Sequence, residues 1–213
     1  MSDKGLLIII SGFSGCGKGT VVNRLVGDCP DEYALSVSST TRSPRPGEKE
    51  GVNYFYRTRE EFLELIDKGE FLEYAEYVGN YYGTSKSFVE QKLDEGINVI
   101  LEIEFQGALK VREKMPDTVM IFIIPPSVAE LERRLVGRNT EGIEIVHSRM
   151  EQALLEAKSI EKYDYLIIND TVEQCVEDIK AVVSSVKFHT VGNHEKIKTI
   201  KRELEQYLKG KGE

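Results

Sequence analysis

Residues 12–20 near the N-terminus have the types and spacing of a loop that binds phosphate groups. The segment reads Gly-Phe-Ser-Gly-Cys-Gly-Lys-Gly-Thr and directly follows the apolar run 6–10. Glycines allow positive φ angles and a close approach of the main chain, so backbone amides can point at an anion. The helix expected next adds its positive N-terminal end, and an ammonium group reaches the β and γ phosphates. These features favour a nucleoside triphosphate site over an ordinary glycine-rich turn; its residues are Gly12, Phe13, Ser14, Gly15, Cys16, Gly17, Lys18, Gly19 and Thr20.

The loop departs from the strict motif directly after its lysine. Gly19 stands where many such loops have the Ser or Thr that binds Mg²⁺, and Thr20 comes one residue later. We therefore expect Mg²⁺ to be held mainly by the nucleotide phosphates and water, with Thr20 and Glu102 as additional candidates.

Two arginines, Arg42 and Arg45, lie in a loop rich in hydroxyl groups and prolines. Pro44 and Pro46 exclude a helix interior here. Arg is suited to pairing with phosphate through two N–H groups, and the neighbouring Ser and Thr add hydroxyl donors. A second phosphate site is one interpretation of this loop, and a solvated basic loop is the alternative.

Two carboxylates, Glu102 and Glu104, follow the apolar strand predicted at 97–101. Alternation puts both on the same side of the chain, at the edge where open α/β sheets bind ligands. An acidic group facing a phosphate loop can hold Mg²⁺ or its waters. The alternative is a pair of solvated carboxylates at the end of a strand.

A third group of cations lies on two predicted helices and the segment between them. Arg134 is on the first helix, Arg138 is in the glycine-bounded tip 137–142, and Arg149 is on the second helix. This arrangement resembles a mobile lid whose cations reach over a transferred phosphoryl group. Arginines on exposed helices are usually only solvated, so the support for this predicted site comes mainly from the loop upstream.

The elements that must position these residues are predicted from hydrophobic patterns. Helical patterns separate five apolar strands, which indicates a parallel sheet with crossover connections. Residues 38–84 are expected to form a small mixed subdomain, which holds six of the ten tyrosines. Capping boxes predict helix starts at 58–61 and 127–130. The predicted core strands are 6–10, 33–37, 97–101, 119–124 and 165–168.

Composition limits the function classes. The chain has 213 residues with 40% apolar content and a formal net charge of -8, which argues against a general nucleic-acid coat protein. No apolar run reaches membrane-spanning length, and the first strand begins too early for a signal peptide. Three cysteines without metal-ligand spacing are typical of a reduced cytoplasmic protein. Cys16 lies at a helix N-terminus, which favours a thiolate, but a small residue filling the loop is the simpler interpretation.

From about residue 5 to 187 the chain resembles the guanylate kinases. The resemblance rests on four segments: 12–20, 36–45, 79–83 and 106–107. It implies an α/β fold of the P-loop NTPase type, with a five-stranded parallel sheet, flanking helices, an inserted mixed α+β GMP-binding subdomain and a helical lid. The expected parts are the core 5–37, 85–125 and 160–190, the GMP-binding subdomain 38–84 and the lid at about 134–150. The tail after about residue 190 lies outside the resemblance, and its apolar pattern predicts an amphipathic helix 194–208 that packs on the core or on a second subunit.

The resemblance also implies roles for individual residues. Guanine offers two N–H donors that a fixed carboxylate such as Glu73 can accept, whereas adenine would leave that carboxylate unpaired. Arg134, Arg138 and Arg149 would stabilise the transition state, and Arg138 and Asn169 would also contact ATP. The GMP phosphate would be held by Arg42, Arg45, Tyr54 and Tyr82, guanine would be read by Ser38, Glu73 and Thr84, and Glu102 and Glu104 would complete the GMP site.

The implied activity is transfer of the γ-phosphoryl group of ATP to GMP and dGMP in purine nucleotide metabolism, by a monomer or homo-oligomer without nucleic-acid or membrane partners. Two departures from the family pattern are Glu104 in place of Asp and Phe13 in place of Pro. One alternative is a kinase for another acceptor. A second is a non-catalytic module that binds a phosphorylated peptide, which would not need the loop glycines or Lys18.

Overall fold

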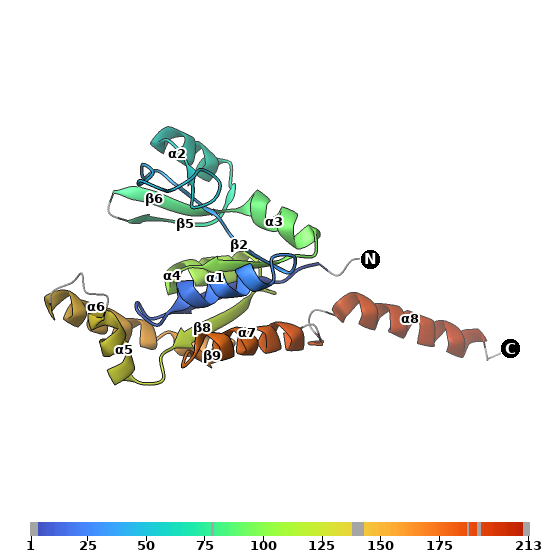
Figure 1. Cartoon of the computed structure of the whole chain (residues 1–213). Coiled ribbons are helices and arrows are strands. Elements are labelled where there is room, and N and C mark those ends of the chain that lie inside the picture. Colours follow the sequence, from blue (N-terminus) through green and yellow to red (C-terminus); the bar gives the residue numbers. More distant parts are fainter. Residues whose placement is uncertain (1–3, 78, 138–142, 187, 191–192, 211–213) are drawn as a thin grey trace. The chain divides into compact units, whose positions relative to one another are not determined.

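The structure is a computed structural model that describes residues 4–77, 79–137, 143–186, 188–190 and 193–210 (Figure 1). The chain divides into two compact units, residues 1–176 and 177–213. All of the predicted phosphate-binding and base-reading residues belong to the first unit.

A five-stranded parallel sheet forms the centre of the first unit, in the order β2-β7-β1-β8-β9. The alternation of strands and helices predicted this sheet, and the prediction is confirmed. The order reverses at β1, which lies between β7 and β8, so the carboxyl ends of these strands form the switch point where such sheets bind ligands. The strands are β1 Leu7–Gly12, β2 Tyr33–Leu35, β7 Asn98–Glu102, β8 Val119–Ile124 and β9 Tyr165–Ile168.

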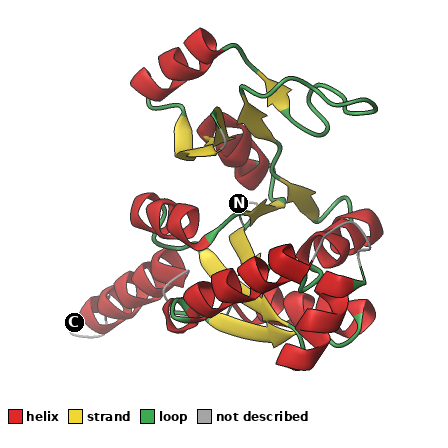
Figure 2. Ribbon diagram, turned by 90° about the vertical axis from the view of Figure 1, so that its left-hand side faces the viewer, coloured by secondary structure: helices red, strands yellow, loops and turns green. Residues whose placement is uncertain are grey.

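Helices connect and flank these strands (Figure 2). Most of these helices were expected from the predicted helix starts and from the crossover connections between parallel strands. Residues 105–114, to which no element was assigned from the sequence, form one more helix, α4. The helices are α1 Lys18–Asp28, α3 Lys86–Asp94, α4 Phe105–Lys114, α5 Val128–Val136, α6 Ile143–Ala157 and α7 Val172–Val186, with a 3₁₀ turn at Ile160–Lys162.

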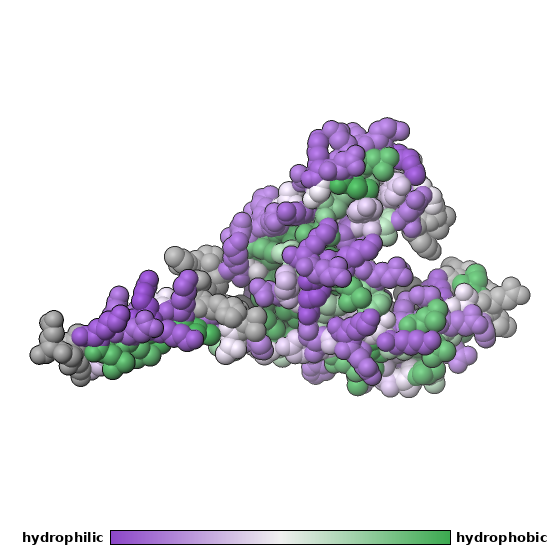
Figure 3. All heavy atoms as spheres, turned by 180° about the vertical axis from the view of Figure 1, so that it is seen from behind, coloured by the Kyte–Doolittle hydropathy of each residue, from purple (hydrophilic) through white to green (hydrophobic). Residues whose placement is uncertain are grey.

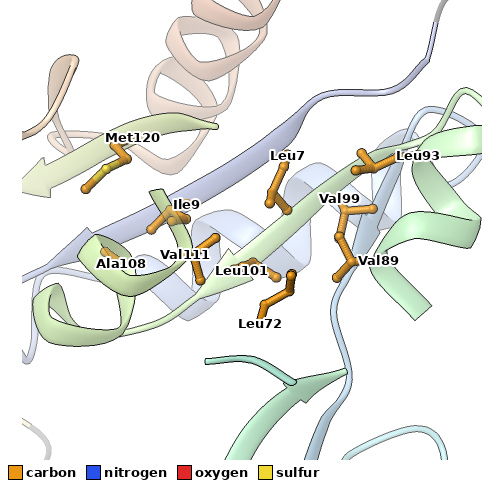
Figure 4. Packing of buried hydrophobic residues seen from close by; sticks show 10 residues of the cluster. All are labelled: Leu7, Ile9, Leu72, Val89, Leu93, Val99, Leu101, Ala108, Val111 and Met120. Carbon is orange, nitrogen blue, oxygen red and sulfur yellow. The ribbon is translucent and has the colours of Figure 1, made fainter. Parts of the chain in front are cut away.

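One face of the sheet packs against α3 and α4 (Figure 4). Alternate residues of β1, such as Leu7 and Ile9, point to this face, while Ile8 and Ile10 between them are also buried. Burial of both strand faces explains why β1 is a continuous apolar run. The cluster consists of Leu7, Ile9, Leu72, Val89, Leu93, Val99, Leu101, Ala108, Val111 and Met120.

A second, four-stranded sheet has the order β4-β3-β6-β5. No strand was predicted for Ser38–Thr40, which leads into the predicted loop of Arg42 and Arg45, but this segment forms strand β3. Its residues pair with 82–84 of β6, and the Thr40 hydroxyl donates to the Tyr81 carbonyl at 2.9 Å. The elements are β3 Ser38–Thr40, β4 Phe55–Tyr56, α2 Arg59–Asp67, β5 Phe71–Tyr77 and β6 Asn80–Ser85.

Strand β5 contains a β-bulge at its start. Phe71 pairs with Ser85 and Glu73 pairs with Thr84, so Leu72 is an extra residue in the ladder. As a result the three consecutive residues 71–73 are all buried, which simple alternation would not allow. Leu72 joins the core cluster, and Glu73 faces Thr84.

The two predicted capping boxes differ in outcome. At Thr58 both reciprocal hydrogen bonds with Glu61 are present, so this prediction is confirmed. At Ser127 the side chain accepts from the Glu130 amide, but the Glu130 carboxylate pairs with Arg133 and Arg134 instead of returning to the cap. Competition from two cations explains why the second box is half formed.

The second unit contains the end of α7 and the helix α8, His194–Gly210. Figure 3 shows α8 with hydrophilic residues along one side and hydrophobic residues along the other. Its exposed apolar side chains are Ile200, Leu204, Tyr207 and Leu208, as the predicted amphipathic pattern requires. None of the described helices is long and apolar enough to cross a bilayer.

The buried position of Ile9 leads to a stability prediction. Ile9 is fully buried in the cluster, so Ile9→Ala should lower the free energy of unfolding by about 2–5 kcal/mol through lost burial and a residual cavity. Val128→Ala, at a side chain that is 70% exposed, should change it by less than about 0.5 kcal/mol. Urea denaturation followed by circular dichroism measures both; equal losses would contradict the assignment of Ile9 to the core.

Candidate active site

The phosphate loop leaves the end of β1 at a point where no side chain fits. A Cβ on Gly12 would lie 2.1 Å from the carbonyl oxygen of Ile123 on β8. Gly17 has a φ of 90°, and a Cβ there would lie 2.6 Å from Nδ2 of Asn169. Glycine is therefore required at both positions, by contact with neighbouring parts of the sheet and, at Gly17, by backbone conformation.

Hydrogen bonds to the carbonyl of Cys16 hold the loop from behind. This oxygen accepts from Nδ2 of Asn169 at 2.7 Å and from Nη1 of Arg134 at 3.2 Å. Arg134 also donates to the Asn169 carbonyl at 3.0 Å and to Glu130 at 2.7 Å. The side chains of Arg134 and Asn169, expected to act on the nucleotide, thus both contact the main chain of the loop, and Arg134 also contacts the main chain of Asn169.

Lys18 lies across the mouth of the loop. Its Nζ donates to the carbonyls of Gly12 at 2.5 Å and Phe13 at 3.2 Å. Arg149 of α6 reaches the same loop, because its Nη1 lies 3.1 Å from Oγ of Ser14. Two of the predicted phosphate-binding cations therefore meet at this loop, whereas Arg138 lies outside the described residues.

The thiol of Cys16 fills the interior of the loop. It is fully buried, and burial raises the pKa of this thiol more than the nearby charge of Lys18 lowers it. The helix N-terminus therefore does not produce a thiolate here, and Cys16 acts as a small packing residue.

Beside the loop, the two sheets enclose a pocket with a cavity volume of about 150 Å³. Glu102 lines this pocket, and both of its carboxylate oxygens lie 3.7 Å from the position that a Cβ on Gly19 would take. The pocket and the phosphate loop therefore share Glu102. The pocket residues are Leu35, Ser36, Ser38, Asn53, Tyr54, Thr84, Leu101, Glu102 and Ile103.

Sequence reasoning missed two polar residues of this pocket, Ser36 and Asn53. The hydroxyl oxygen of Ser36 is buried and has no hydrogen-bond partner among the described residues. Ser36 falls inside the predicted strand 33–37, whereas β2 ends at Leu35, so no signal in the sequence indicated that Ser36 lines a pocket.

Three residues that were predicted to read a base lie in one row across the small sheet. Ser38 pairs with Thr84 on the neighbouring strand, and Thr84 pairs with Glu73 on the next. The Thr84 hydroxyl donates to Oε1 of Glu73 at 2.8 Å. On the other side, a Cβ on Gly107 of α4 would lie 3.1 Å from Oε2 of Glu73, so glycine there leaves room for the carboxylate.

Burial controls the acidity of Glu73. Desolvation raises the pKa of this carboxyl, and the hydrogen bond from Thr84 and the charges of Lys110 and Lys114 oppose the shift only in part. A buried acceptor in this state gains most from a ligand that donates hydrogen bonds to it.

The predicted phosphate-binding residues of the small sheet gather around Arg42. Its guanidinium lies 5.3 Å from the centre of the Tyr54 ring, and the Tyr54 and Tyr82 rings are 6.0 Å apart. Nη2 of Arg42 donates to Glu48 at 2.9 Å, a partner that the sequence did not single out. Arg45 follows in the same loop with an exposed side chain.

Glu104 differs from the other predicted residues. It is exposed and occupies the N-cap position of α4, but its side chain makes no capping hydrogen bond. The described contacts assign it no partner in the pocket, whereas its neighbour Glu102 lines the pocket.

The chain is similar to known guanylate kinases in both sequence and fold. The family model described as guanylate kinase matches residues 4–186. A guanylate kinase of Streptococcus pneumoniae is 53% identical over 88% of this chain and 90% of its own, and one of Streptococcus pyogenes is 50% identical over 92% and 95%. A crystal structure of guanylate kinase from Anaplasma phagocytophilum is 36% identical, with a TM-score of 0.69 over 88% of this chain and 89% of that chain.

The burial of Cys16 leads to a prediction about thiol reactivity. Because Cys16 is fully buried with a raised pKa, it should react with Ellman's reagent at least about tenfold more slowly than the partly exposed Cys29. Cys29→Ser should therefore remove the fast phase of the reaction, and Cys16→Ser should leave it. The opposite pattern would show that the Cys16 thiol is accessible.

Proposed function

The chain belongs to the guanylate kinase family and phosphorylates GMP with ATP, and we propose that the phosphate loop and the neighbouring pocket divide this work between them. The observation that carries the proposal is the position of Glu102, which lines the pocket and lies against Gly19 of the loop. ATP bound at the loop and an acceptor bound in the pocket then meet at the end of β7. Phosphoryl transfer needs this alignment and charge stabilisation more than it needs a protein nucleophile.

We propose that the row Ser38, Thr84 and Glu73 holds the guanine base. The Glu73 carboxylate has one oxygen bonded to Thr84 and a second oxygen beside Gly107. It can accept the two N–H donors on the guanine edge, whereas adenine would leave a buried carboxylate without a donor. Burial makes that loss costly, which supports selection of guanine.

The acceptor phosphate is proposed to bind Arg42, Arg45, Tyr54 and Tyr82. Arg42 and Arg45 follow β3, Tyr54 directly precedes β4, and Tyr82 lies within β6. Residues 38–84 thus act as the acceptor-binding part of the chain. None of these contacts requires the ribose 2′-hydroxyl, so dGMP is expected to be a substrate as well.

On the ATP side, Lys18 and Arg149 are proposed to neutralise the transferred phosphoryl group. Lys18 donates to loop carbonyls, and these are weaker partners than a phosphate, so exchanging them for a phosphate is favourable. Arg134 is proposed to act indirectly by holding the carbonyl of Cys16 and thereby the loop. Arg138 is assigned to the lid by resemblance.

The donor set fits Mg²⁺ bound mainly through the nucleotide. Among the described residues no group of three or more His, Cys, Asp or Glu side chains could hold a metal by itself. Glu102 supplies the hard oxygen ligand nearest the loop, and Thr20 is exposed at its end. Mg²⁺ bound to ATP supplies charge neutralisation at the phosphates, and these two residues would hold it or its waters.

The cysteine content and the small-molecule substrates support action in the cytoplasm. The chain has three cysteines, an odd number without metal-ligand spacing, as expected in a reducing compartment.

The proposal is tested by ADP release from ATP and Mg²⁺ with GMP, dGMP, AMP, CMP and UMP as separate acceptors. Turnover is expected with GMP and dGMP, to be lower by a factor of about 10² or more with the others because the base-reading contacts are lost, and to stop with a chelator. A coupled assay with purified protein measures each rate.

Lys18→Ala serves as the loss-of-function control in this assay. It should lower turnover by a factor of about 10²–10³ while the circular dichroism spectrum is unchanged. Normal turnover in this variant would refute the role of Lys18, and equal turnover with AMP would refute guanine reading by the pocket.

The raised pKa of Glu73 predicts a pH dependence of GMP binding. Guanine needs the ionised carboxylate, and the raised pKa means that protonation begins at a higher pH than for an exposed Glu. GMP affinity should therefore fall as the pH is lowered through this pKa, by up to about tenfold per unit below it. Glu73→Gln should bind GMP about 10–100-fold more weakly at neutral pH and lack this dependence.

The ratio of wild-type to Glu73→Gln affinities, measured by calorimetry, cancels the titration of the phosphate itself. Glu76→Gln, at an exposed position on the same strand, should follow the wild type. A ratio that is constant with pH would show that the Glu73 carboxylate does not read guanine.

A further inference from the structure

Glu48 lies in the loop between β3 and β4, and its carboxylate accepts three hydrogen bonds. Its Oε1 accepts from Nη2 of Arg42 at 2.9 Å. Its Oε2 accepts from the backbone N–H of Arg45 at 2.7 Å and from the hydroxyl of Tyr56 at 2.8 Å. The side chain is only 18% exposed, and that of Arg42 is 16% exposed.

These bonds connect both arginines that are proposed to hold the acceptor phosphate. Arg42 is fixed by Glu48 on one edge and by the Ser43 carbonyl at 2.8 Å, and its plane lies over the Tyr54 ring. A guanidinium has five N–H donors, so its remaining edge can face a phosphate while Glu48 holds it in place. The bond to the Arg45 amide fixes the turn from which the Arg45 side chain projects.

The carboxylate is held strongly in the ionised form. The hydrogen bond from Arg42, then that from the Arg45 amide, lowers the pKa of Glu48 to about 2. Glu48 thus stays charged at any working pH, and Arg42, whose pKa is raised first by the same hydrogen bond, stays a cation. The ionisation of this pair therefore does not change over the working pH range, and Glu48 holds Arg42 in place throughout it.

Two effects of Glu48 on a bound phosphate oppose each other. Its negative charge repels the phosphate and cancels part of the attraction of Arg42. Its three hydrogen bonds hold both arginine positions in one geometry, which removes conformational entropy before the ligand arrives. The partly buried position and the short bonds favour the second effect.

We propose that Glu48 is a positioning residue that pre-organises Arg42 and Arg45 for the phosphate of the acceptor nucleotide. This inference rests on the proposed binding of the GMP phosphate by these arginines. It adds an acid to a site that otherwise consists of cations and hydroxyl groups, and this acid does not touch the substrate.

The test compares Glu48→Gln with wild type in calorimetric binding of GMP and of guanosine, which lacks the phosphate. Glutamine has one acceptor oxygen, so it cannot keep the bonds to both Arg42 and the Arg45 amide. We expect at least about tenfold weaker binding of GMP, because charge-assisted hydrogen bonds are lost, with guanosine binding unchanged within about twofold. The KM for GMP should rise, and the KM for ATP should not change.

Glu50→Gln is the matched control. Glu50 lies two residues away in the same loop and accepts from the Tyr56 amide at 2.8 Å and from Arg57 at 3.3 Å, without contacting Arg42 or Arg45. The Glu50→Gln variant should therefore bind GMP as tightly as the wild-type protein does.

Each of the following results would contradict the inference. Tighter binding of GMP by Glu48→Gln would show that charge repulsion dominates. An equal loss of guanosine and GMP binding would show that Glu48 supports the whole pocket, and unchanged binding of both would show that it has no role. A wild-type protein that binds guanosine and GMP equally would contradict the proposed phosphate site itself.

Discussion

A single constraint shapes the first unit of this protein: main-chain amides must surround phosphate oxygens without being covered by side chains. The loop at the end of β1 meets it by lying against the Ile123 carbonyl and the Asn169 side chain, where only Gly12 and Gly17 fit. Asn169 and Arg134 then hold the Cys16 carbonyl from behind. The three supports come from neighbouring parts of the fold: Ile123 is in β8, Asn169 follows β9, which pairs with β8, and Arg134 is in α5, which follows β8.

The acceptor pocket is built on a different principle. The phosphate loop uses backbone groups, whereas the small sheet presents side chains in rows set by strand pairing. Ser38, Thr84 and Glu73 lie opposite one another because antiparallel partners share a face. In the proposed site, Glu73, a buried carboxylate with a raised pKa, reads the base, and Arg42, which is paired with the ionised Glu48, binds the phosphate.

Much of this was predictable from the sequence, because long apolar runs and glycine spacing are strong local signals. Strands β8 and β9 have the bounds that their apolar residues predict. Strand β3 was missed because Ser38–Thr40 is polar and is stabilised by pairing with the distant residues 82–84. Helix α4 was missed because it has Gly107 in its first turn and no side-chain cap. Glu48 carries no signal in the sequence at all, since an acid in a polar loop usually faces solvent; only its three partners distinguish it.

The bulge in β5 has a mechanical consequence. Leu72 is fixed in the core cluster of the large sheet, and the next residue, Glu73, accepts a hydrogen bond from the Thr84 hydroxyl. The small sheet is thus pinned to the large one at β5, its edge strand, while β4 and the loop that carries Arg42 lie at the opposite edge. If the small sheet rotates about the contact at Leu72, Glu73 moves least and the arginines move furthest. A base held at Glu73 would then stay almost in place, while a phosphate held by the arginines would move toward ATP.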